Sequence, residues 1–296
     1  MPHLPRPLRL LPLLVLCLSP RPALAHGASA GYSNQGLKLL TPENIRRVKE
    51  DLYVSPGRIR VRYTFENLTT QPIQARVAFP LPDTELLLEG TVSEVSDFSL
   101  RVAGQRHATR RESVYKVQGR EYRGADTGKA QKLIQQEQAR RRAGGRPTDD
   151  FTASVQHAEV WEQRFGPGEA LEVEIAYRPS VSGDLGWDQR TYKHRRVRED
   201  FCLDTPTRKG LDKALSRTGD KALERRQLQW LSYVLVSGDN WAGPIGQFHL
   251  TLEKPEPGSL VSTCIEGLEK TSPVRFELTR ENYRPAEDLD VIFFRP

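Results

Sequence analysis

The stretch Ile59-Arg60-Val61-Arg62-Tyr63-Thr64-Phe65-Glu66 decides the fold class of this chain. Its apolar and polar side chains alternate strictly, which is typical of a β-strand with one buried and one solvent-facing side. The preceding Ser55-Pro56-Gly57 predicts a type II turn, because proline presets the second turn position and glycine accepts a positive φ at the third. We therefore expect residues 52–54 to be the partner strand of a hairpin.

The same alternation occurs elsewhere in the chain. Residues 153–165 and 171–177 flank Gly166-Pro167-Gly168, which predicts a second hairpin. Further strands are expected at 73–79, 91–102, 229–237, 245–253, 260–264, 274–279 and 289–294. Many short strands separated by turns predict a mainly β protein with an immunoglobulin-like β-sandwich architecture, either one large sandwich or two packed sandwiches.

Two segments interrupt the β pattern and predict helical insertions. Residues 126–142 have a small apolar stripe, with Asp126 or Thr127 as the cap and Gly144-Gly145 as the stop. In the second segment we expect Thr205 to cap a helix whose first position is Pro206. Its buried face is expected to consist of Leu211, Ala214 and Leu215.

The first 25 residues have the pattern of a secretory signal peptide. Basic residues precede the apolar run 10–18, and Ala23-Leu24-Ala25 matches an A-x-A cleavage site. No later segment approaches about 18 uninterrupted apolar residues, so we do not expect an integral membrane protein. After the signal peptide at 1–25 we expect an N-terminal β-rich domain at 26–200, with a basic helical insertion at 126–143. Residues 201–296 are expected to form a C-terminal part with a helix and further strands.

The cysteines fit an exported protein. Cys17 lies in the predicted signal peptide, which leaves Cys202 and Cys264 in the mature chain. In an oxidising compartment an even pair is more simply a disulfide than a metal or catalytic site. Two unpaired buried thiols are the alternative.

Positive charge is concentrated in the middle of the chain. The formal net charge of the whole sequence is +6, yet residues 101–148 contain thirteen Lys or Arg against four Asp or Glu. Arg140, Arg141, Arg142 and Arg146 are therefore candidate contacts for an unknown protein or an anionic envelope component, such as lipid phosphates or acidic glycans. The alternative is a solvated helix face. Nucleic acid is not an expected partner, because the segment lacks the interleaved aromatic residues of single-strand binders.

Several short phrases are specific in combination. They are Leu52-Tyr53-Val54-Ser55, Ala78-Phe79-Pro80-Leu81-Pro82, Trp161-Glu162-Gln163-Arg164-Phe165, Val261-Ser262-Thr263-Cys264 and Asp288-Leu289-Asp290-Val291. Over almost the whole mature chain they resemble the bacterial exported family catalogued as domain of unknown function 4424. The resemblance implies a periplasmic or secreted location and cysteines near Cys202 and Cys264, but it transfers no activity, substrate or catalytic residue. The Arg-rich helix around Arg140 departs from the family pattern.

Trp241 lies in the phrase Asn240-Trp241-Ala242-Gly243-Pro244-Ile245-Gly246, which predicts a tight turn. We expect its ring to cover the end of the core. A surface aromatic that stacks on a sugar is the functional alternative.

Cleavage after residue 25 would leave His26 as the mature N-terminus. Its amine and imidazole, joined by a second histidine, form a possible copper site. The candidate second histidines are His107, His157, His194 and His249. The chain contains no metalloprotease helix motif, phosphate loop, dinucleotide fingerprint or calcium loop. We therefore predict a non-enzymatic binding or assembly role without a cofactor. A copper-binding protein or redox enzyme that uses His26 is the alternative.

Overall fold

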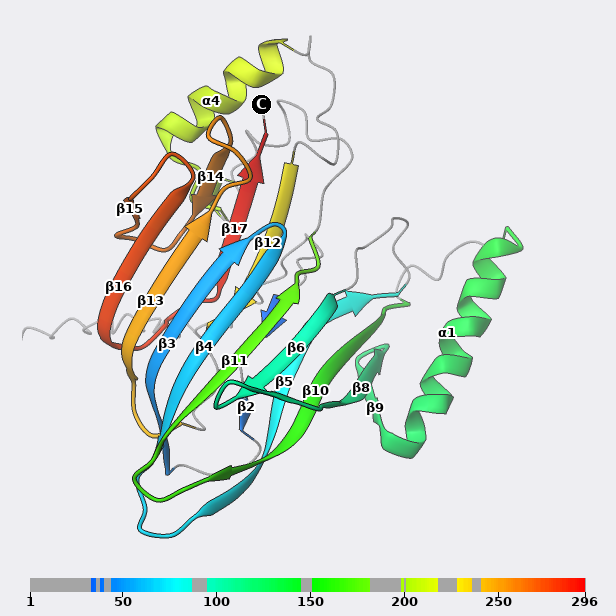
Figure 1. Cartoon of the computed structure of the whole chain (residues 1–296). Coiled ribbons are helices and arrows are strands. Elements are labelled where there is room, and N and C mark those ends of the chain that lie inside the picture. Colours follow the sequence, from blue (N-terminus) through cyan, green and yellow to red (C-terminus); the bar gives the residue numbers. More distant parts are fainter. Residues whose placement is uncertain are drawn as a thin grey trace, which may run out of the picture. The chain divides into compact units, whose positions relative to one another are not determined.

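The computed structural model describes residues 33–35, 38–39, 44–86, 95–144, 151–181, 198–199, 201–217, 228–235 and 241–295. Together these residues form three β-sheets, two α-helices and a short 3₁₀ turn (Figure 1). The prediction of a mainly β protein with two helical excursions is confirmed.

The largest sheet has eight strands in the order β15, β16, β13, β3, β4, β11, β6 and β7. In that order their bounds are Glu269–Lys270, Arg275–Tyr283, Ile245–Glu253, Ile45–Ser55, Arg58–Asn67, Ala170–Arg178, Ser96–Val102 and Gln105–His107. All neighbours are antiparallel except β13 and β3, which run parallel. Strands from before and after residue 200 therefore share one sheet.

Two smaller sheets complete the β structure. The five-stranded sheet contains, in order, β2 (Lys38–Leu39), β5 (Ile73–Glu85), β10 (Ala153–Phe165), β8 (Arg110–Val117) and β9 (Arg120–Arg123). The four-stranded sheet contains β1 (Ser33–Gln35), β12 (Leu228–Val234), β17 (Leu289–Phe294) and β14 (Leu260–Thr263).

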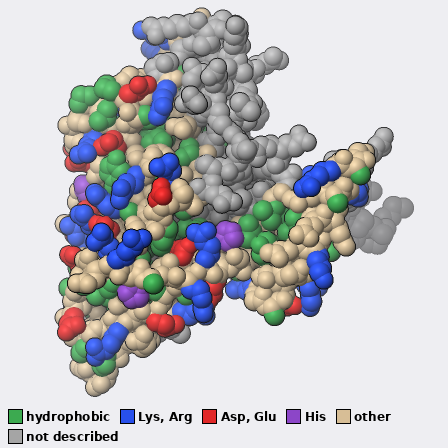
Figure 2. All heavy atoms as spheres, turned by 45° about the vertical axis from the view of Figure 1, so that its right-hand side comes forward, with side chains coloured by type: hydrophobic (Ala, Val, Ile, Leu, Met, Phe, Trp, Pro, Cys, Tyr) green, Lys and Arg blue, Asp and Glu red, His purple; other side chains and the backbone are tan. Residues whose placement is uncertain are grey.

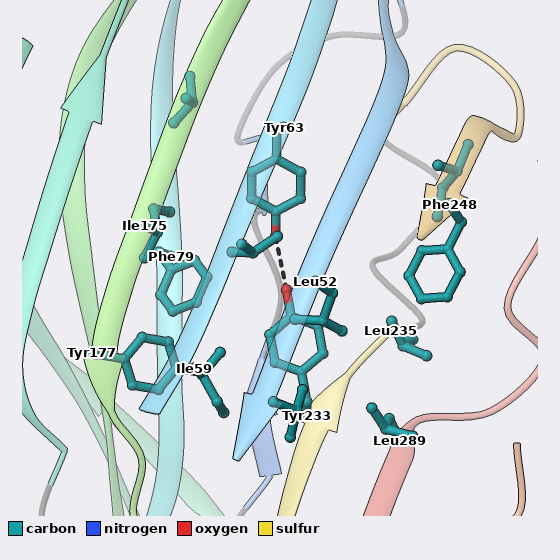
Figure 3. Packing of buried hydrophobic residues seen from close by; sticks show 14 of the residues in the cluster. Leu52, Ile59, Tyr63, Phe79, Ile175, Tyr177, Tyr233, Leu235, Phe248 and Leu289 are labelled. Atoms are coloured by element: carbon teal, nitrogen blue, oxygen red, sulfur yellow. Dashed lines mark hydrogen bonds between the residues drawn. The ribbon is translucent and has the colours of Figure 1, made fainter. Parts of the chain in front are cut away.

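All three sheets contribute to one main hydrophobic core. The four apolar side chains of the stretch 59–66 are each at most 1% exposed. They belong to a single cluster that also contains Phe79 of the five-stranded sheet and Val291 of the four-stranded sheet. Figure 3 shows the buried rings of this cluster, including the hydrogen bond of 2.9 Å between the hydroxyls of Tyr63 and Tyr233. Packing of sheet faces around a shared core is the sandwich that the alternating strands predict.

The first predicted hairpin is confirmed and is longer than expected. β3 pairs with β4 along their whole length, down to Ser55 opposite Arg58. The prediction of a type II turn is wrong, because Gly57 does not have the positive φ that this turn requires. Instead, the Ser55 hydroxyl donates to the Arg58 carbonyl and accepts from the Arg58 amide, each at 3.1 Å, which closes the turn.

The second predicted hairpin is wrong. β10 pairs with β5 and β8, whereas β11 pairs with β4 and β6, so the turn at 166–168 carries the chain from one sheet to another. Buried Asn67 joins this crossing to the end of β4: its amide nitrogen donates to the carbonyls of Phe165 and Gln71, at 3.2 and 2.7 Å. Its backbone carbonyl accepts from the Gly168 amide at 3.1 Å. Alternation identifies a strand but not its partner.

Both predicted helices are present, as α1 (Thr127–Arg142) and α4 (Thr205–Arg217). Asp126, one of the two expected caps, occupies the N-cap position of α1, but its side chain makes no capping hydrogen bond. The cap predicted for α4 is wrong by one residue, because the Asp204 carboxylate accepts the Thr207 amide at 2.8 Å. No helix in the described part of the chain is long and apolar enough to cross a membrane.

Each helix packs through a small core of its own. Ala130 and Ile134 of α1 pack with Val117 of β8, apart from the main core. Leu211 of α4 packs with Ile292 and Phe294, whereas the alternate residues of β17 belong to the main core. α4 therefore covers the second face of the four-stranded sheet.

Candidate functional site

The outer face of the eight-stranded sheet carries one row of charged side chains, contributed by five neighbouring strands. Strand register pairs His249 of β13 with Asp51 of β3, Asp51 with Arg62 of β4, Arg62 with Glu174 of β11, and Glu174 with Arg101 of β6. Neighbouring strands lie about 4.8 Å apart, so the charges alternate in sign from Asp51 through Arg62 and Glu174 to Arg101, with the His249 ring beside Asp51.

Part of this row is already paired. Arg62 Nε donates to Glu174 Oε2 at 2.6 Å, and this bond raises the pKa of the Arg62 guanidinium. His249 Nδ1 lies 3.3 Å from Asp51 Oδ1. Arg101 donates to the Gly104 carbonyl at 3.1 Å. The row is therefore partly fixed by its own contacts.

A hollow of about 350 Å³ lies over this row. Its charged lining consists of Lys49, Asp51, Arg62, Arg101, Glu172 and Glu174, and Thr64 lies among them. Three cations and three carboxylates give the lining no formal net charge. Figure 2 shows basic and acidic side chains interspersed over this part of the molecule. This arrangement is suited to binding a small polar molecule and includes no nucleophile held by a base.

A second candidate surface is the basic module, which we define as β8, β9 and α1. Its exposed cations are Arg110, Arg111, Lys116, Arg120, Arg123, Lys129, Lys132, Arg140 and Arg142. Its three acids each form an ion pair with at least one cation of the module: Glu112 with Arg110, Glu121 with Arg123, and Glu137 with Arg140 and Arg141. Asp126, which directly precedes α1, pairs with Lys129. The module therefore carries an excess of positive charge after its own acids are paired.

The predicted arginine cluster is divided by this pairing. Glu137, only 6% exposed, accepts hydrogen bonds of 2.9 Å from both Arg140 and Arg141. These bonds lower the pKa of the Glu137 carboxyl to about 2. Arg142 is exposed, and Arg146 lies outside the described residues. Two of the four predicted contact residues thus help to fix α1.

The predicted disulfide between Cys202 and Cys264 is present. It links the segment that leads into α4 with the end of β14, across 62 residues of sequence. Close to it, the Ser262 hydroxyl donates to the Cys202 carbonyl at 3.2 Å. The bond therefore fastens α4 to the four-stranded sheet.

Trp241 is a core residue, not a surface aromatic. It is 8% exposed, and its ring stacks on Phe65 with the ring centres 4.6 Å apart. The Arg47 guanidinium lies 5.8 Å from the ring centre. The sugar-stacking alternative is wrong for this residue, because the core and Arg47 occupy its surroundings.

The histidines of the copper hypothesis do not converge in the part of the chain that the structure describes. His26 and His194 lie outside it. The His157 ring is 2.7 Å from the Ser113 hydroxyl on the neighbouring strand, and the His107 ring is 3.0 Å from the Ala108 carbonyl. Among the described residues no three His, Cys, Asp or Glu side chains are grouped as metal ligands. Copper binding at His26 stays a prediction.

Sequence reasoning missed the hollow. Its charged members come from β3, β4, β6 and β11, and Arg62 and Glu174 are 112 residues apart in the chain. The sequence identified Arg62, Thr64, Glu172 and Glu174 only as polar positions of alternating strands, and Lys49 and Asp51 precede the strand expected at 52–54. Arg60 and Arg62 on one strand, with Glu172 and Glu174 on another, were the available signal. The pairing of those two strands became visible only in the fold.

The family model described as Domain of unknown function (DUF4424) matches residues 25–131 and 126–292. The chain belongs to this family. DUF4424 therefore extends on both sides of α1, where the two matched segments meet, and the resemblance drawn from the short phrases is confirmed. None of the curated proteins matches the chain in sequence.

Among solved structures, this DUF4424 chain is similar to a candidate nutrient binding protein from Legionella pneumophila. The two are 14% identical with a TM-score of 0.51, and the alignment covers 89% of this chain and 71% of that chain. At this identity the likeness shows the fold alone. An M1 zinc metallopeptidase from Deinococcus radiodurans aligns with a TM-score of 0.27 and 12% identity. This alignment covers 88% of the DUF4424 chain but only 43% of the metallopeptidase.

Proposed function

We propose that this protein is an exported, non-enzymatic binding or assembly protein of the bacterial cell envelope, and that the basic module contacts an anionic component there. The observation that carries the proposal is the set of exposed cations on β8, β9 and α1, which outnumber the acids of the same elements. Clustered Lys and Arg side chains attract phosphate or carboxylate surfaces through their summed field.

Arg120, Lys132 and Arg142 are the cations best suited to this contact. All three are exposed, and none forms an ion pair with a described acidic residue. Arg140 and Arg141 are less suitable, because their bonds to Glu137 compete with an external anion. The partner therefore meets the module through Arg120 of β9 and Lys132 and Arg142 of α1, with Arg146 as a further predicted contact.

The disulfide supports an exported location. Disulfides persist in oxidising compartments and are rare in the cytosol. The intact mass of protein recovered from a bacterial periplasm tests this part of the proposal. We expect a chain that begins at His26 and is two hydrogens lighter than the reduced form. A chain that retains residues 1–25 and stays in the cytoplasm would contradict export.

Co-sedimentation with lipid vesicles tests the contact surface. The protein is mixed with vesicles that contain phosphatidylglycerol and with vesicles of phosphatidylcholine alone, and a soluble acidic polysaccharide competes for binding. We expect binding to the anionic vesicles only. Each surface cation contributes about 1 kcal/mol, so the triple variant Arg120→Gln, Lys132→Gln, Arg142→Gln should bind about a hundredfold more weakly.

The matched control removes the same charge from exposed positions outside the module, with Arg58→Gln, Lys270→Gln and Arg284→Gln. This control should bind like the wild type. If both triple variants lose the same affinity for the anionic vesicles, the net charge of the protein, and not the basic module, determines its binding. Absence of binding to both the anionic vesicles and the polysaccharide would reject the contact surface.

A further inference from the structure

We propose that the hollow on the outer face of the eight-stranded sheet binds a small zwitterion of the amino acid or short peptide class. This inference uses residues separate from the basic module and does not depend on the function proposed for it. Its volume of about 350 Å³ lies within the range of small-molecule sites, about 300–1,000 Å³.

The lining offers both signs of charge at separate places. Lys49 of β3 and Glu172 of β11 stand on either side of Thr64 of β4, because register pairs both with that residue. Two strand spacings separate their backbones by about 10 Å. A ligand between the two side chains meets an ammonium on one side and a carboxylate on the other.

Lys49 and Glu172 are available to a ligand, and so in part is Arg101, which has no ion pair with a described acid and donates one hydrogen bond to the Gly104 carbonyl. Arg62 is bonded to Glu174, and Asp51 lies beside His249. Neither Lys49 nor Glu172 has an ion pair with any residue that the structure describes, and both are exposed. The ligand carboxylate therefore pairs with Lys49, and the ligand ammonium pairs with Glu172.

The balance of charge selects against other ligand classes. A simple anion would gain from three cations but would also face Asp51, Glu172 and Glu174. A sugar would lack a stacking partner, because Tyr63, the aromatic residue of the lining, is 1% exposed and directs its hydroxyl to Tyr233. A zwitterion satisfies both signs at once.

The site is formed before the ligand arrives. Lys49, Thr64 and Glu172 lie on adjacent strands of one continuous sheet, and the bonded pair of Arg62 and Glu174 lies beside them. A rigid frame reduces the loss of conformational freedom on binding. We therefore expect binding without rearrangement of the sheet.

Calorimetric titration with free amino acids and dipeptides tests the proposal. Each dipeptide that binds is compared with its N-acetylated and C-amidated forms, which lack one end charge each. We expect the affinity for each blocked form to be lower than that for the free dipeptide by a factor of about ten or more, as is usual when a charge-assisted hydrogen bond is lost. Glucose and inorganic phosphate serve as the ligands that should not bind.

Two charge-neutralising variants assign the ends of the ligand. Lys49→Gln should weaken binding of the free dipeptide about tenfold and have little further effect on its C-amide. Glu172→Gln should do the same for the free dipeptide and its N-acetyl form. Lys270→Gln and Glu269→Gln, exposed at the other edge of the sheet, are the matched controls and should bind like the wild type.

Circular dichroism of each variant verifies that the fold is retained before binding is compared. The proposal is overturned if no amino acid or dipeptide binds, if glucose or phosphate binds in their place, or if Lys49→Gln and Glu172→Gln leave the affinity for a bound zwitterion unchanged. The vesicle assay and this titration use different ligands and variants. Failure of one proposal is thus distinguishable from failure of the other.

Discussion

At the scale of single residues, Arg47 and Glu50 are unusual because they place a charged pair inside the sandwich. They are 7% and 1% exposed, and Arg47 Nη1 lies 2.9 Å from Glu50 Oε2. Burial raises the pKa of the Glu50 carboxyl, and the neighbouring guanidinium partly opposes this change. Each member of the pair compensates for the desolvation of the other.

Removing one member of the pair should therefore lower the free energy of unfolding more than removing both. We expect Arg47→Met to lower the free energy of unfolding by about 3–5 kcal/mol, because Glu50 then lies buried without its partner. The double variant Arg47→Met, Glu50→Leu should recover most of this loss. Urea unfolding measures both values.

Arg46→Met is the matched control for this experiment. Arg46 forms a solvent-exposed pair with Glu66, so its loss should change the unfolding free energy by less than about 1 kcal/mol. Equal effects of Arg46→Met and Arg47→Met would show that burial is not what makes the Arg47 pair important.

Gly246 is required by the close approach of two strands. A β-bulge at Val48 interrupts the pairing of β3 with β4, and the Val48 carbonyl oxygen points toward β13. A Cβ atom at position 246 would lie 2.5 Å from that oxygen, which belongs to the backbone and cannot rotate away. The glycine therefore permits β13 to pair with β3.

We expect Gly246→Ala to destabilise the protein by about 1–3 kcal/mol in urea unfolding, since the strands must separate locally. Gly57→Ala is the control: a Cβ there meets nothing within 4 Å, and the residue has no positive φ. If Gly57→Ala destabilised the protein as much as Gly246→Ala, the steric argument would be contradicted.

At the scale of elements, α1 depends on a charge cluster as well as on its small core. Glu137 lies on the same side of the helix as buried Ala130 and Ile134, and the guanidinium groups of Arg140 and Arg141 enclose its carboxylate. The pKa of Glu137 in the folded state is about 2, below its ordinary value of 4.5.

This shift predicts a pH dependence that belongs to α1. The unfolded chain binds the Glu137 proton more readily, so the cluster stabilises the fold above pH about 4.5 and loses its contribution as the pH falls toward about 2. The stability difference between wild type and Glu137→Gln should be largest at neutral pH and vanish on acidification. Unfolding followed by circular dichroism across this range measures it.

Glu256→Gln, on an exposed turn, is the matched control for the pH series. The difference in stability between Glu256→Gln and the wild type should not change with pH in the way expected for Glu137→Gln. A Glu137→Gln difference that stays constant from neutral to acidic pH would mean that the two arginines do not recognise the ionised carboxylate.

At the scale of the whole molecule, one core joins strands from distant parts of the sequence, and one covalent bond restrains α4. The loop of 62 residues that Cys202 and Cys264 close corresponds to about 4 kcal/mol on the chain-entropy model. Replacing both cysteines with serine should remove about 2–4 kcal/mol from the unfolding free energy.

Denaturant unfolding with and without reductant measures this contribution. The wild type should lose stability in reductant, and the double serine variant should be insensitive to it. A variant as stable as the oxidised wild type would contradict a structural role for the disulfide.

The sequence by itself determined the mainly β class, the buried side of the alternating strands, where both helices lie and which two cysteines pair. These properties depend on local alternation, on capping and on residue counts, and the stretch 59–66 shows the alternation. The sequence did not identify the first half of β3 or the short strands β7, β9 and β15. The sequence did not determine that 153–165 and 171–177 enter different sheets, that Trp241 stacks on Phe65, or that Lys49, Arg62 and Glu172 line one hollow. Strand pairing depends on how several faces bury their apolar area together, and neighbours in a sheet can lie far apart in the chain. Only the tertiary structure decides which charges meet on its surface.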